Sequence, residues 1–406
     1  MRAGASPEAR SPASSPSAAG LRYETISTEA AFAALAQWWD PLVLSMARPS
    51  PFLLHCWLLQ WWRHYGGGCR LAVQVAYRGP VLVGALPLIV HRRRSLEVAT
   101  FLGGRQSVLA DVLLAPGEDP AVAATLVERA VTGQDYVDVF GLPGGCLLAE
   151  VAGRRRMHLF ERIEAPVLDL SAGWEAVYRE KTSGETRRLH RRRRRQLASL
   201  GRIEVSVART PAELEPALEH AFRLHSLRWE GRSDGSGFVT PTGLRFHRAT
   251  MRALGELDVA RIVSLDLDGR PIAFHYYFAL AGRAYLHRVA FDPAFSRYSP
   301  GLVNILDSLE VIEGEGLTRV EFLGGAERYK RALADRFEPL HLAIGLPGTP
   351  AGRAVVAARA GWLAARESLK RRKAARRLYD GLAPARRLLA RPRDVLRPSG
   401  VGTVED

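Results

Sequence analysis

Residues 283–306, "RAYLHRVAFDPAFSRYSPGLVNIL", carry the pattern that decides the fold. The segment 283–292 has the apolar and β-branched composition of a half-buried strand, and "PAFSRYS" after it is typical of a loop. Pro300 and Gly301 then open a helix, because proline is favoured at the first helical position. Residues 317–325, "LTRVEFLGG", read as another strand. The stretch therefore predicts a strand, a helix and a second strand in direct succession.

The start of this helix is a candidate anion site. A helix N-terminus presents backbone N–H groups without partners and the positive end of the helix dipole, which suits a phosphate or pyrophosphate group. Gly301 would let a ligand approach the backbone closely, and Arg297 would add positive charge. The alternative is an ordinary strand–helix junction. The motif alone favours this alternative, because proline and glycine are common at such junctions.

The elements around this stretch repeat an order that occurs earlier in the chain. Both halves show helix, helix, strand, hairpin, strand, helix and strand, with hairpin turns at Arg78-Gly79-Pro80, Asp268-Gly269 and Ala281-Gly282. No repeat of individual residues accompanies this order, so duplication is inferred from topology alone. We therefore expect an α/β (α+β) fold with two related domains, each a mixed, mostly antiparallel sheet flanked by helices.

The predicted organisation has four parts. A Ser-, Pro- and Ala-rich tail over residues 1–20 is expected to be disordered. Domains follow at residues 21–165 and 166–350, and a basic amphipathic tail occupies residues 351–406. Within the first domain we expect one helix from Ser27 as N-cap, a strand over residues 107–117, and a core role for three tryptophans at helical spacing. These tryptophans are Trp57, Trp61 and Trp62.

Charge is concentrated in two segments. The net charge is +15, of which residues 181–202 carry +8 and residues 351–406 carry +9, so the remainder is close to neutral. Arginine strongly outnumbers lysine, which is typical of a GC-rich coding bias. The bias explains part of the arginine density without any function. A nucleic-acid-binding role would have to come from these two segments.

The run "TRRLHRRRRRQLASLG" at residues 186–201 is predicted to be a helix that ends at Gly201. Leu189, Leu197 and Leu200 would lie on one side, with arginines around the rest. We interpret the run as a solvated helix face, which also forms a positive wall of the cleft between the domains.

Cysteine usage and hydropathy bear on location. Cys56, Cys69 and Cys146 have neither metal-ligand nor redox spacing, which favours a reduced, cytoplasmic setting. The N-terminus lacks the apolar stretch of a signal peptide. The longest apolar run, "VLVGALPLIV", is too short to span a bilayer. No metal-hydrolase or Ser-His-Asp motif occurs, so metal catalysis has no support in the sequence.

Three motifs together carry a family resemblance: "SLRW" at residues 226–229, "GRPIAFHYYF" at 269–278, and "YSPG" followed by "FLGGAERYK" within 298–330. The chain resembles, over residues 25–345, the CelD-type acetyltransferases of the GNAT superfamily, which are associated with bacterial cellulose and exopolysaccharide production. It is similar in layout to the FemABX transferases, which have two GNAT-like domains.

The resemblance implies an acyl-CoA site in the second domain, most simply for acetyl-CoA and without a metal. The pyrophosphate would lie at the turn Arg297, Ser299, Pro300, Gly301 and Leu302. The usual GNAT loop has glycines three and five residues after a Gln or Arg, whereas here Pro300 is third and Gly301 fourth after Arg297. This departure leaves aminoacyl-tRNA, the carrier of a FemABX-like enzyme, as an alternative.

Direct acyl transfer needs a base for the acceptor's proton and a donor for the thiolate or the oxyanion. The candidate catalytic residues near the predicted site are His275, His287, Glu321 and Tyr329. On their strands His287 would share a face with Tyr285 and Val289, and His275 would share one with Tyr277. The alternative for either histidine is a structural role on a half-buried strand.

The candidate substrate-binding residues are Arg228, Trp229, Tyr277 and Lys330. Trp229 ends a long helix, where a core role is the alternative to lining the acceptor cleft. Lys330 would bind an acidic part of the acceptor or carrier. Its alternative role is an ion pair with a carboxylate such as Glu327.

These observations predict an acyltransferase that acts on an amine or hydroxyl of a saccharide or other small acceptor. A nucleic-acid-binding protein that uses the arginine run, and an aminoacyl-tRNA-dependent transferase, are the alternatives. The tail at residues 351–406 would lie on the anionic surface of the inner membrane, or would extend into solvent.

Overall fold

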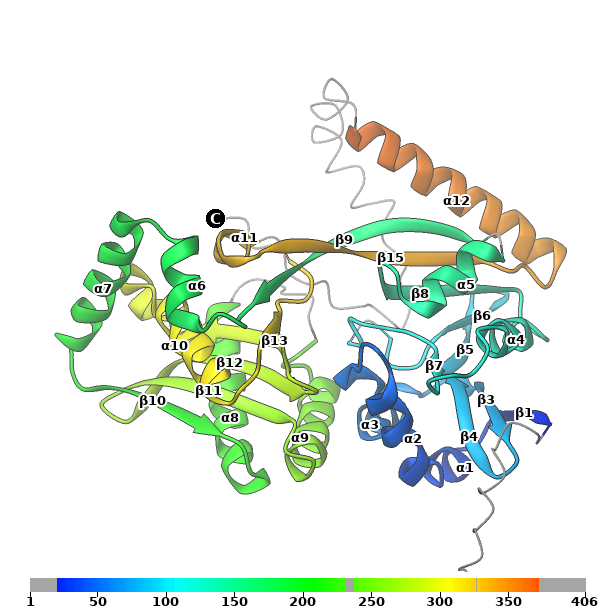
Figure 1. The fold of residues 1–406 in the computed structure, drawn as a ribbon, viewed down its shortest axis with the longest axis horizontal. Coiled ribbons are helices and arrows are strands. Elements are labelled where there is room, and N and C mark those ends of the chain that lie inside the picture. The colour runs from blue at the N-terminus through cyan, green and yellow to red at the C-terminus, as the bar shows by residue number, and fades with distance from the viewer. Residues whose placement is uncertain (1–19, 105, 156, 231–236, 326, 372–406) are drawn as a thin grey trace, which may run out of the picture.

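The computed structural model describes residues 20–371 except 105, 156, 231–236 and 326. The tail predicted at residues 1–20 thus lies outside the described residues apart from Gly20, as do residues 372–406 of the basic tail. Two α/β halves lie side by side and share one sheet of 11 strands, while a second sheet of four strands belongs to the first half (Figure 1).

The first half is built around a long hairpin that bends. Pro87 interrupts one arm and Ala72 the other, so each arm pairs in the four-stranded sheet near the turn and in the 11-stranded sheet beyond the bend. The predicted turn is confirmed, with Gly79 at a φ of 59°. The elements are β1 (Leu21–Ile26), α1 (Glu29–Ala33), α2 (Ala36–Ser45), the 3-10 helix η2 (Pro51–Leu53), α3 (His55–Tyr65), β2 (Cys69–Leu71), β3 (Val73–Arg78), β4 (Val81–Leu86), β5 (Leu88–Arg93), β6 (Leu96–Phe101), β7 (Leu113–Leu114), α4 (Ala121–Arg129), β8 (Tyr136–Pro143), α5 (Leu147–Arg154) and β9 (His158–Asp169).

The second half starts from strong local signals. Thr210 and Glu213 form a reciprocal capping box at the start of α8. Both predicted hairpin turns are present, with positive φ at their two central residues. The elements are α6 (Trp174–Lys181), α7 (Gly184–Ala198), β10 (Ile203–Ala208), α8 (Pro211–Arg228), α9 (Pro241–Glu256), β11 (Ala260–Leu267), β12 (Arg270–Leu280), β13 (Arg283–Phe291), the 3-10 helix η3 (Pro293–Tyr298), α10 (Pro300–Gly314), β14 (Arg319–Glu321), α11 (Arg328–Leu333), β15 (Arg336–Gly345) and α12 (Pro350–Arg371).

The two halves have the same topology. In each half a group of antiparallel strands is followed by a helix and then by a further strand. This further strand pairs in parallel with one of the antiparallel strands before the helix. In the first half β6 pairs in parallel with β8 across α4, and in the second half β13 pairs in parallel with β14 across α10. This confirms the predicted class of two mixed, mostly antiparallel sheets flanked by helices.

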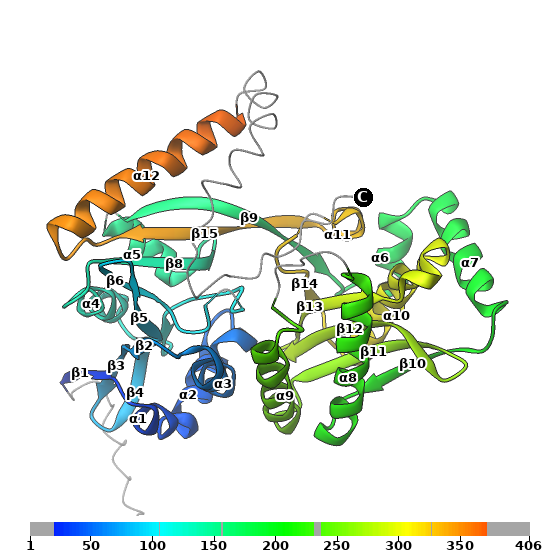
Figure 2. The same cartoon turned by 180° about the vertical axis from the view of Figure 1, so that it is seen from behind.

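The last strand of each half crosses to the other half. β9, which follows β8 and α5, pairs with β14, while β15, which follows β14 and α11, pairs with β8. The two crossing strands also pair with each other along their length, and they run together above both halves in Figures 1 and 2. The exchange makes one continuous sheet. The predicted domain boundary after residue 165 falls inside β9 and stays a prediction.

The largest apolar core is also shared. Phe52 and Trp57, from η2 and α3, are fully buried and contact Phe278 of β12, while the Trp57 ring also packs against Phe246 of α9. Burying each such side chain contributes about 1.5–3 kcal/mol. The core prediction is confirmed for Trp57 and Trp61, while Trp62 is half-buried.

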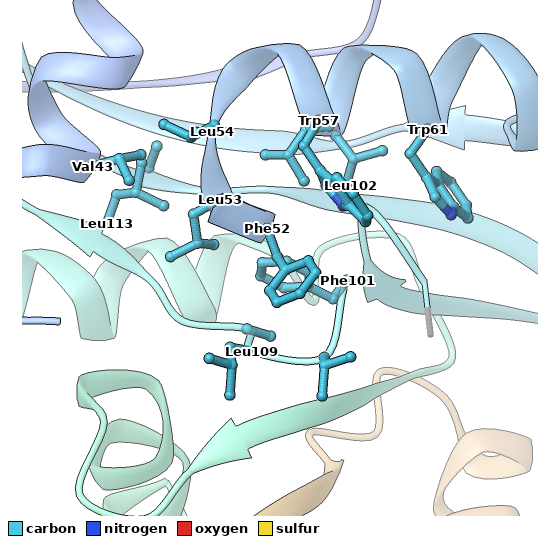
Figure 3. Close-up of a cluster of buried hydrophobic side chains, with 14 of the residues drawn as sticks. Val43, Phe52, Leu53, Leu54, Trp57, Trp61, Phe101, Leu102, Leu109 and Leu113 are labelled. Carbon is cyan, nitrogen blue, oxygen red and sulfur yellow. The ribbon is translucent and has the colours of Figure 1, made fainter. Parts of the chain in front are cut away.

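Two local predictions in the first half are wrong. The helix expected from Ser27 is capped by Thr28 instead and is broken into α1 and α2. Within residues 107–117 only β7 is a strand. The rest is an apolar loop whose Leu109 lies near Phe52 of η2, while Leu113 of β7 lies beside Val43 of α2 (Figure 3).

The arginine-rich helix is present as α7, but its predicted apolar side is not. Of its three leucines only Leu197 is buried, whereas Leu189 and Leu200 are exposed, and Leu200 lies beyond the end of the helix. Hydrogen bonds from its arginines, rather than a leucine stripe, hold much of α7 in place, as described below.

Candidate active site

Strands β13 and β14 separate at the centre of the second half. Their parallel ladder has three residue pairs and stops at Tyr285 and Glu321, while β13 continues to Phe291. Past this point the chain that continues β14 stays paired with β9, because the Phe322 N–H donates to Pro166 O at 3.0 Å. The backbone of β13 after Tyr285 therefore borders an opening in the sheet.

A β-bulge lies on β13 at this opening. Tyr277 pairs with Leu286 and Tyr276 pairs with Arg288, so His287 is the additional residue on its strand. Bulges redirect side chains and occur frequently beside active sites. Here His287 lies on the same face as Tyr276 and Phe278, and the rings of these residues are 5.3 and 5.4 Å from its own.

The bulge changes which residues share a face. Val289 pairs with His275 and packs with Tyr277, so it lies opposite His287, and the expectation that His287 and Val289 share a face is wrong. His275 and Tyr277 do share a face, with ring centroids 6.0 Å apart. The sheet thus separates the two candidate histidines: His275 lies toward α10, and His287 lies toward α9 and α3.

The turn before α10 has the features of an anion site. Ser299 adopts left-handed backbone geometry at φ 54° and ψ 52°, and its carbonyl accepts the N–H groups of Leu302 and Val303 at 3.1 Å each. Since Pro300 has no N–H, the amide of Gly301 becomes the first donor of the helix. Leu302 itself is half-buried.

Gly301 has a packing role in this turn. A Cβ there would lie 2.8 Å from Cδ1 of Phe291, the last residue of β13. Glycine therefore lets the start of α10 press against the end of the strand that borders the opening. Whether a ligand also uses the space at Gly301 stays a prediction.

An arginine that the sequence analysis did not single out reaches the turn. Arg193 of α7 donates to Ser299 Oγ, and its Nε is buried without a hydrogen-bond partner among the described residues. Its neighbour Arg194 is hydrogen-bonded to Asp307 of α10, which fixes α7 against that helix. These contacts attach one face of the arginine run to α10 within the second half, and its role as a wall of the cleft between the domains stays a prediction.

Two of the predicted residues add charge at this place. Arg228, near the end of α8, stacks with its guanidinium 4.4 Å from the ring centre of Phe291. Arg297 in η3 is exposed and lies 4.6 Å from the ring centre of Tyr298. Arg193, Arg228 and Arg297, together with the N-terminus of α10, form what we call the arginine turn. It is suited to a phosphorylated ligand.

His287 is a neutral imidazole in an aromatic setting. It is 8% exposed, and neither ring nitrogen has a hydrogen-bond partner among the described residues. Burial, followed by the charge of Arg288, lowers its pKa well below the usual value. The ring is therefore unprotonated at neutral pH and able to accept a proton, which a general base requires.

His275 has a different environment. It is 1% exposed, and burial, helped by Lys330, lowers its pKa to about 3. Its partner on the same face, Tyr277, donates to Glu315 Oε2 at 3.3 Å, at the C-terminal end of α10. Tyr277 thus lies at the opposite end of α10 from the arginine turn, and the structure does not bring the two together.

Glu321 is held by three guanidinium groups. It accepts hydrogen bonds from Arg48 at 3.0 Å, Arg283 at 3.3 Å and Arg319 at 2.8 Å, and it is 1% exposed. Arg48 belongs to the first half and also pairs with Glu338 of β15. Both carboxylate oxygens of Glu321 accept hydrogen bonds from arginines. The geometry therefore favours an ion pair between the two halves, and it disfavours a role for Glu321 as proton acceptor.

Lys330 fixes the turn after β14. Its Nζ donates to Gly324 O at 3.2 Å and pairs with Glu327 at 3.0 Å, which is the ion pair that the sequence offered as an alternative. Burial lowers the pKa of Lys330. The neighbouring Tyr329 packs edge-on against Phe322, and burial raises its pKa, so its phenol stays protonated and suits a proton donor.

Trp229 caps the C-terminus of α8 and is half-buried, with its ring 6.3 Å from that of His225. Whether Trp229 lines the acceptor cleft stays a prediction. Among the residues that the structure describes, no group of three or more His, Cys, Asp or Glu side chains is placed to hold a metal ion.

The comparisons with known proteins identify the domain that holds this site. Residues 184–331 match the family model of the acetyltransferase (GNAT) domain. This span contains the opening between β13 and β14, the bulge and the arginine turn. The chain is an acyltransferase with a GNAT fold. No curated protein has a sequence that matches the chain.

Solved structures are similar at low sequence identity. One is the C-terminal DUF2156 domain of a protein described as a lysylphosphatidylglycerol synthetase from Agrobacterium fabrum, with 14% identity, a TM-score of 0.51, and coverage of 81% of this chain and 96% of that chain. FemX has 10% identity, a TM-score of 0.50, and coverage of 78% and 96%. A tandem GNAT protein from the clavulanic acid biosynthesis pathway has 15% identity, a TM-score of 0.45, and coverage of 82% and 99%. At these identities the likeness concerns the fold alone.

Proposed function

We propose that the chain transfers an acyl group, most simply acetyl, from an acyl-CoA to a hydroxyl or amine of a small acceptor. The observation that supports this is the arginine turn beside the opening between β13 and β14. Arg193, Arg228 and Arg297 would bind the phosphates of the coenzyme, together with the Gly301 amide. The unpartnered Nε of Arg193 is a donor that such a phosphate would satisfy.

The proposed reaction uses His287, Tyr329 and the backbone of β13. The acceptor oxygen or nitrogen attacks the thioester carbonyl, the new bond to the acyl carbon forms, and the bond from that carbon to sulfur breaks. His287 takes the acceptor's proton. Backbone N–H groups of β13 beyond Tyr285 would stabilise the oxyanion, and Tyr329 remains the predicted proton donor to the thiolate. A cellulose- or exopolysaccharide-related saccharide is the acceptor class that we propose.

Coenzyme binding provides the direct test. Isothermal titration of the full-length protein with acetyl-CoA should show saturable binding to one site. Arg193→Gln should weaken it about 10-fold, since a charge-assisted hydrogen bond contributes about 1.5–3 kcal/mol. Arg195→Gln, an exposed position on the same helix, is the matched control and should leave the affinity within twofold. Absence of saturable binding would refute the proposal.

A second candidate function keeps aminoacyl-tRNA as the carrier. The observation in its favour is the outer face of α7, where Arg188, Arg191, Arg192 and Arg195 are exposed. Gel-shift titration with tRNA at two salt concentrations tests it, because each phosphate contact adds to the salt dependence. Tight tRNA binding without any acetyl-CoA binding would favour this function over the first.

We further propose contact with an anionic membrane through the C-terminal segment. Val356, Ala360 and Leu363 bury one side of α12 on the sheet, while Trp362 is 59% and Leu369 46% exposed on the other. An exposed tryptophan on a basic helix is typical of an interfacial segment. No helix in the described residues is long and apolar enough to cross a bilayer. Co-sedimentation with phosphatidylglycerol vesicles, but not with phosphatidylcholine vesicles, is the expected result.

A further inference from the structure

Four buried side chains on the α9 side of the sheet carry polar atoms without partners. They come from α9, β12 and β13, are each at most 8% exposed, and include five atoms with no hydrogen bond among the described residues. These atoms are Nδ1 of His247, Oγ1 of Thr250, the hydroxyl of Tyr276, and Nδ1 and Nε2 of His287. We call these four residues the polar cluster. Buried polar groups are nearly always hydrogen-bonded, so this concentration indicates a binding site.

The members of the polar cluster lie close together. The ring of His287 is 5.3 Å from Tyr276 and 6.0 Å from His247, and His247 is 6.0 Å from Tyr276. Thr250 lies one helical turn after His247 on α9, so the two side chains project from the same side of that helix. The four side chains therefore form one group on the α9 side of the sheet.

The cluster adjoins the place where the acyl group would react. His287 is the bulge residue at the point where β13 leaves β14, and it is the most exposed member of the cluster. The arginine turn, by contrast, lies at the far end of β13, at the start of α10. The sheet opening thus has coenzyme-binding groups at one end and unpartnered neutral donors and acceptors on its α9 face.

The first half supplies an apolar wall to the cluster. The rings of Trp57 and Phe52 lie 5.7 and 5.6 Å from that of His287, and Phe278 of β12 lies 5.4 Å from it. Aromatic walls around a few convergent polar groups are the common composition of a small-molecule site.

The charge of the cluster selects among acceptors. Burial, followed by the charge of Arg288, lowers the pKa values of His247 and His287, and burial raises the pKa of Tyr276, so all three groups are uncharged at neutral pH. The cluster consists of two histidines, a threonine and a tyrosine, so it contains no carboxylate of its own. A protonated amine would therefore find no counter-ion within the cluster, whereas a hydroxyl needs only the hydrogen bonds that the cluster has to offer.

We propose that the polar cluster binds the acceptor, and that this acceptor is an uncharged polyhydroxylated molecule such as a sugar, acylated on oxygen. The inference rests on the proposed acyl-CoA function and specifies its acceptor. The hydroxyl oxygen forms the bond to the acyl carbon as the carbon–sulfur bond breaks. Its proton passes to His287, and the coenzyme leaves as the thiolate, which then takes up a proton. Thr250, Tyr276 and His247 orient the remaining hydroxyls.

Two variants separate a binding role from a structural one. Thr250→Val and Tyr276→Phe remove one hydroxyl each and keep the shape of the side chain. Removing an unsatisfied buried hydroxyl should leave the melting temperature of the free protein unchanged or raise it. Thr125→Val on α4, outside the cluster, removes a half-buried hydroxyl that donates to Ala121 O at 2.9 Å, and it serves as the matched control. A fall of several degrees in either cluster variant would overturn the proposal, because the hydroxyl would then have a structural partner.

The acceptor class is tested with the full-length protein and acetyl-CoA, by following release of the coenzyme thiol. Glucose, cellobiose and N-acetylglucosamine form the uncharged set; glucosamine, galactosamine and lysine form the amine set. We expect release with the uncharged set, and a loss of at least 10-fold in kcat/KM for the sugar in both cluster variants. The KM for acetyl-CoA and the activity of Thr125→Val should stay within twofold of the unsubstituted protein.

The other outcomes are decisive as well. Faster release with the amine set would overturn the hydroxyl assignment. No release with either set from a protein that binds acetyl-CoA would overturn the acceptor proposal while leaving the coenzyme site intact. Failure to bind acetyl-CoA would instead refute the proposed function itself.

Discussion

Acidification should destabilise this protein through its buried histidines. His247, His275 and His287 are at most 8% exposed, and burial lowers the pKa of each, to about 3 for His275. In the unfolded chain each would titrate near pH 6.5. Below that pH the unfolded state therefore binds more protons than the folded state, and the free energy of unfolding must fall as the pH falls.

The magnitude follows from proton linkage. Between pH 7.5 and pH 5.5, a histidine that stays neutral when folded and has a pKa near 6.5 when unfolded loses about 1.4 kcal/mol of stabilisation. Three such residues give a loss of about 4 kcal/mol, which is a large part of the 5–15 kcal/mol that is typical of folded proteins. The loss is complete only below the folded pKa values, so it should still be growing at pH 5.5.

Equilibrium urea unfolding of the full-length protein at the two pH values measures this loss. Each of the variants His247→Gln, His275→Gln and His287→Gln should reduce the difference between the two pH values by about 1.4 kcal/mol, whatever it does to stability at pH 7.5. His158→Gln, at an exposed position on β9, should leave the difference unchanged. If the three variants and the control show the same pH difference, the reasoning about neutral buried imidazoles is wrong.

Three further predictions concern the contacts between the halves and the arginine turn. Arg48→Gln should lower the free energy of unfolding by about 3 kcal/mol in urea unfolding, since it leaves the buried Glu321 without one of its guanidinium partners. Trp57→Ala should cost about 3–5 kcal/mol and should speed hydrogen exchange in both halves, because its ring packs against each. Arg193→Gln should weaken acetyl-CoA binding about 10-fold in calorimetry, whereas Arg195→Gln should leave it unchanged.

Local chemistry made much of the second half predictable. The capping box at Thr210 and Glu213, the Asp268-Gly269 turn and Pro300 at the first position of a helix each act within a few residues. Such signals need no distant partner. They place α8, the β12 hairpins and α10 correctly, and with them the junction where the arginine turn forms.

The crossing strands could not be predicted from the sequence. β9 was not recognised, although it is a 12-residue strand, because its partners β14 and β15 lie far along the chain. Its buried residues do not alternate regularly with exposed ones, so the period of a strand is weak in its sequence. β1 was missed for a related reason: five of its six residues are not buried, so hydrophobic periodicity is weak.

The candidate site shows the same limit. Arg193 lies one helical turn before the buried Leu197, so helical periodicity could have placed it on the inward side of α7. The five consecutive arginines concealed this, because the sequence does not distinguish the one that faces inward. The bulge at His287 depends on the pairing of β12 with β13, which the sequence does not display. His247 is one polar residue within an amphipathic helix, and only the fold brings it to β12 and β13.

The exchange of β9 and β15 between the halves means that the strands around the opening come from both parts of the chain. The span that matches the acetyltransferase domain, residues 184–331, contains β13 and β14 but lacks β9, which is the only other neighbour of β14 in the sheet order of the described residues. It also lacks Trp57, Phe52 and Arg48, which pack on or pair with the strands around the opening. The hydroxyl of Tyr285, at the point where the strands separate, donates to Pro49 O of the first half. The first half therefore acts as more than a support, because the geometry of the opening depends on side chains and a strand from outside the matched domain.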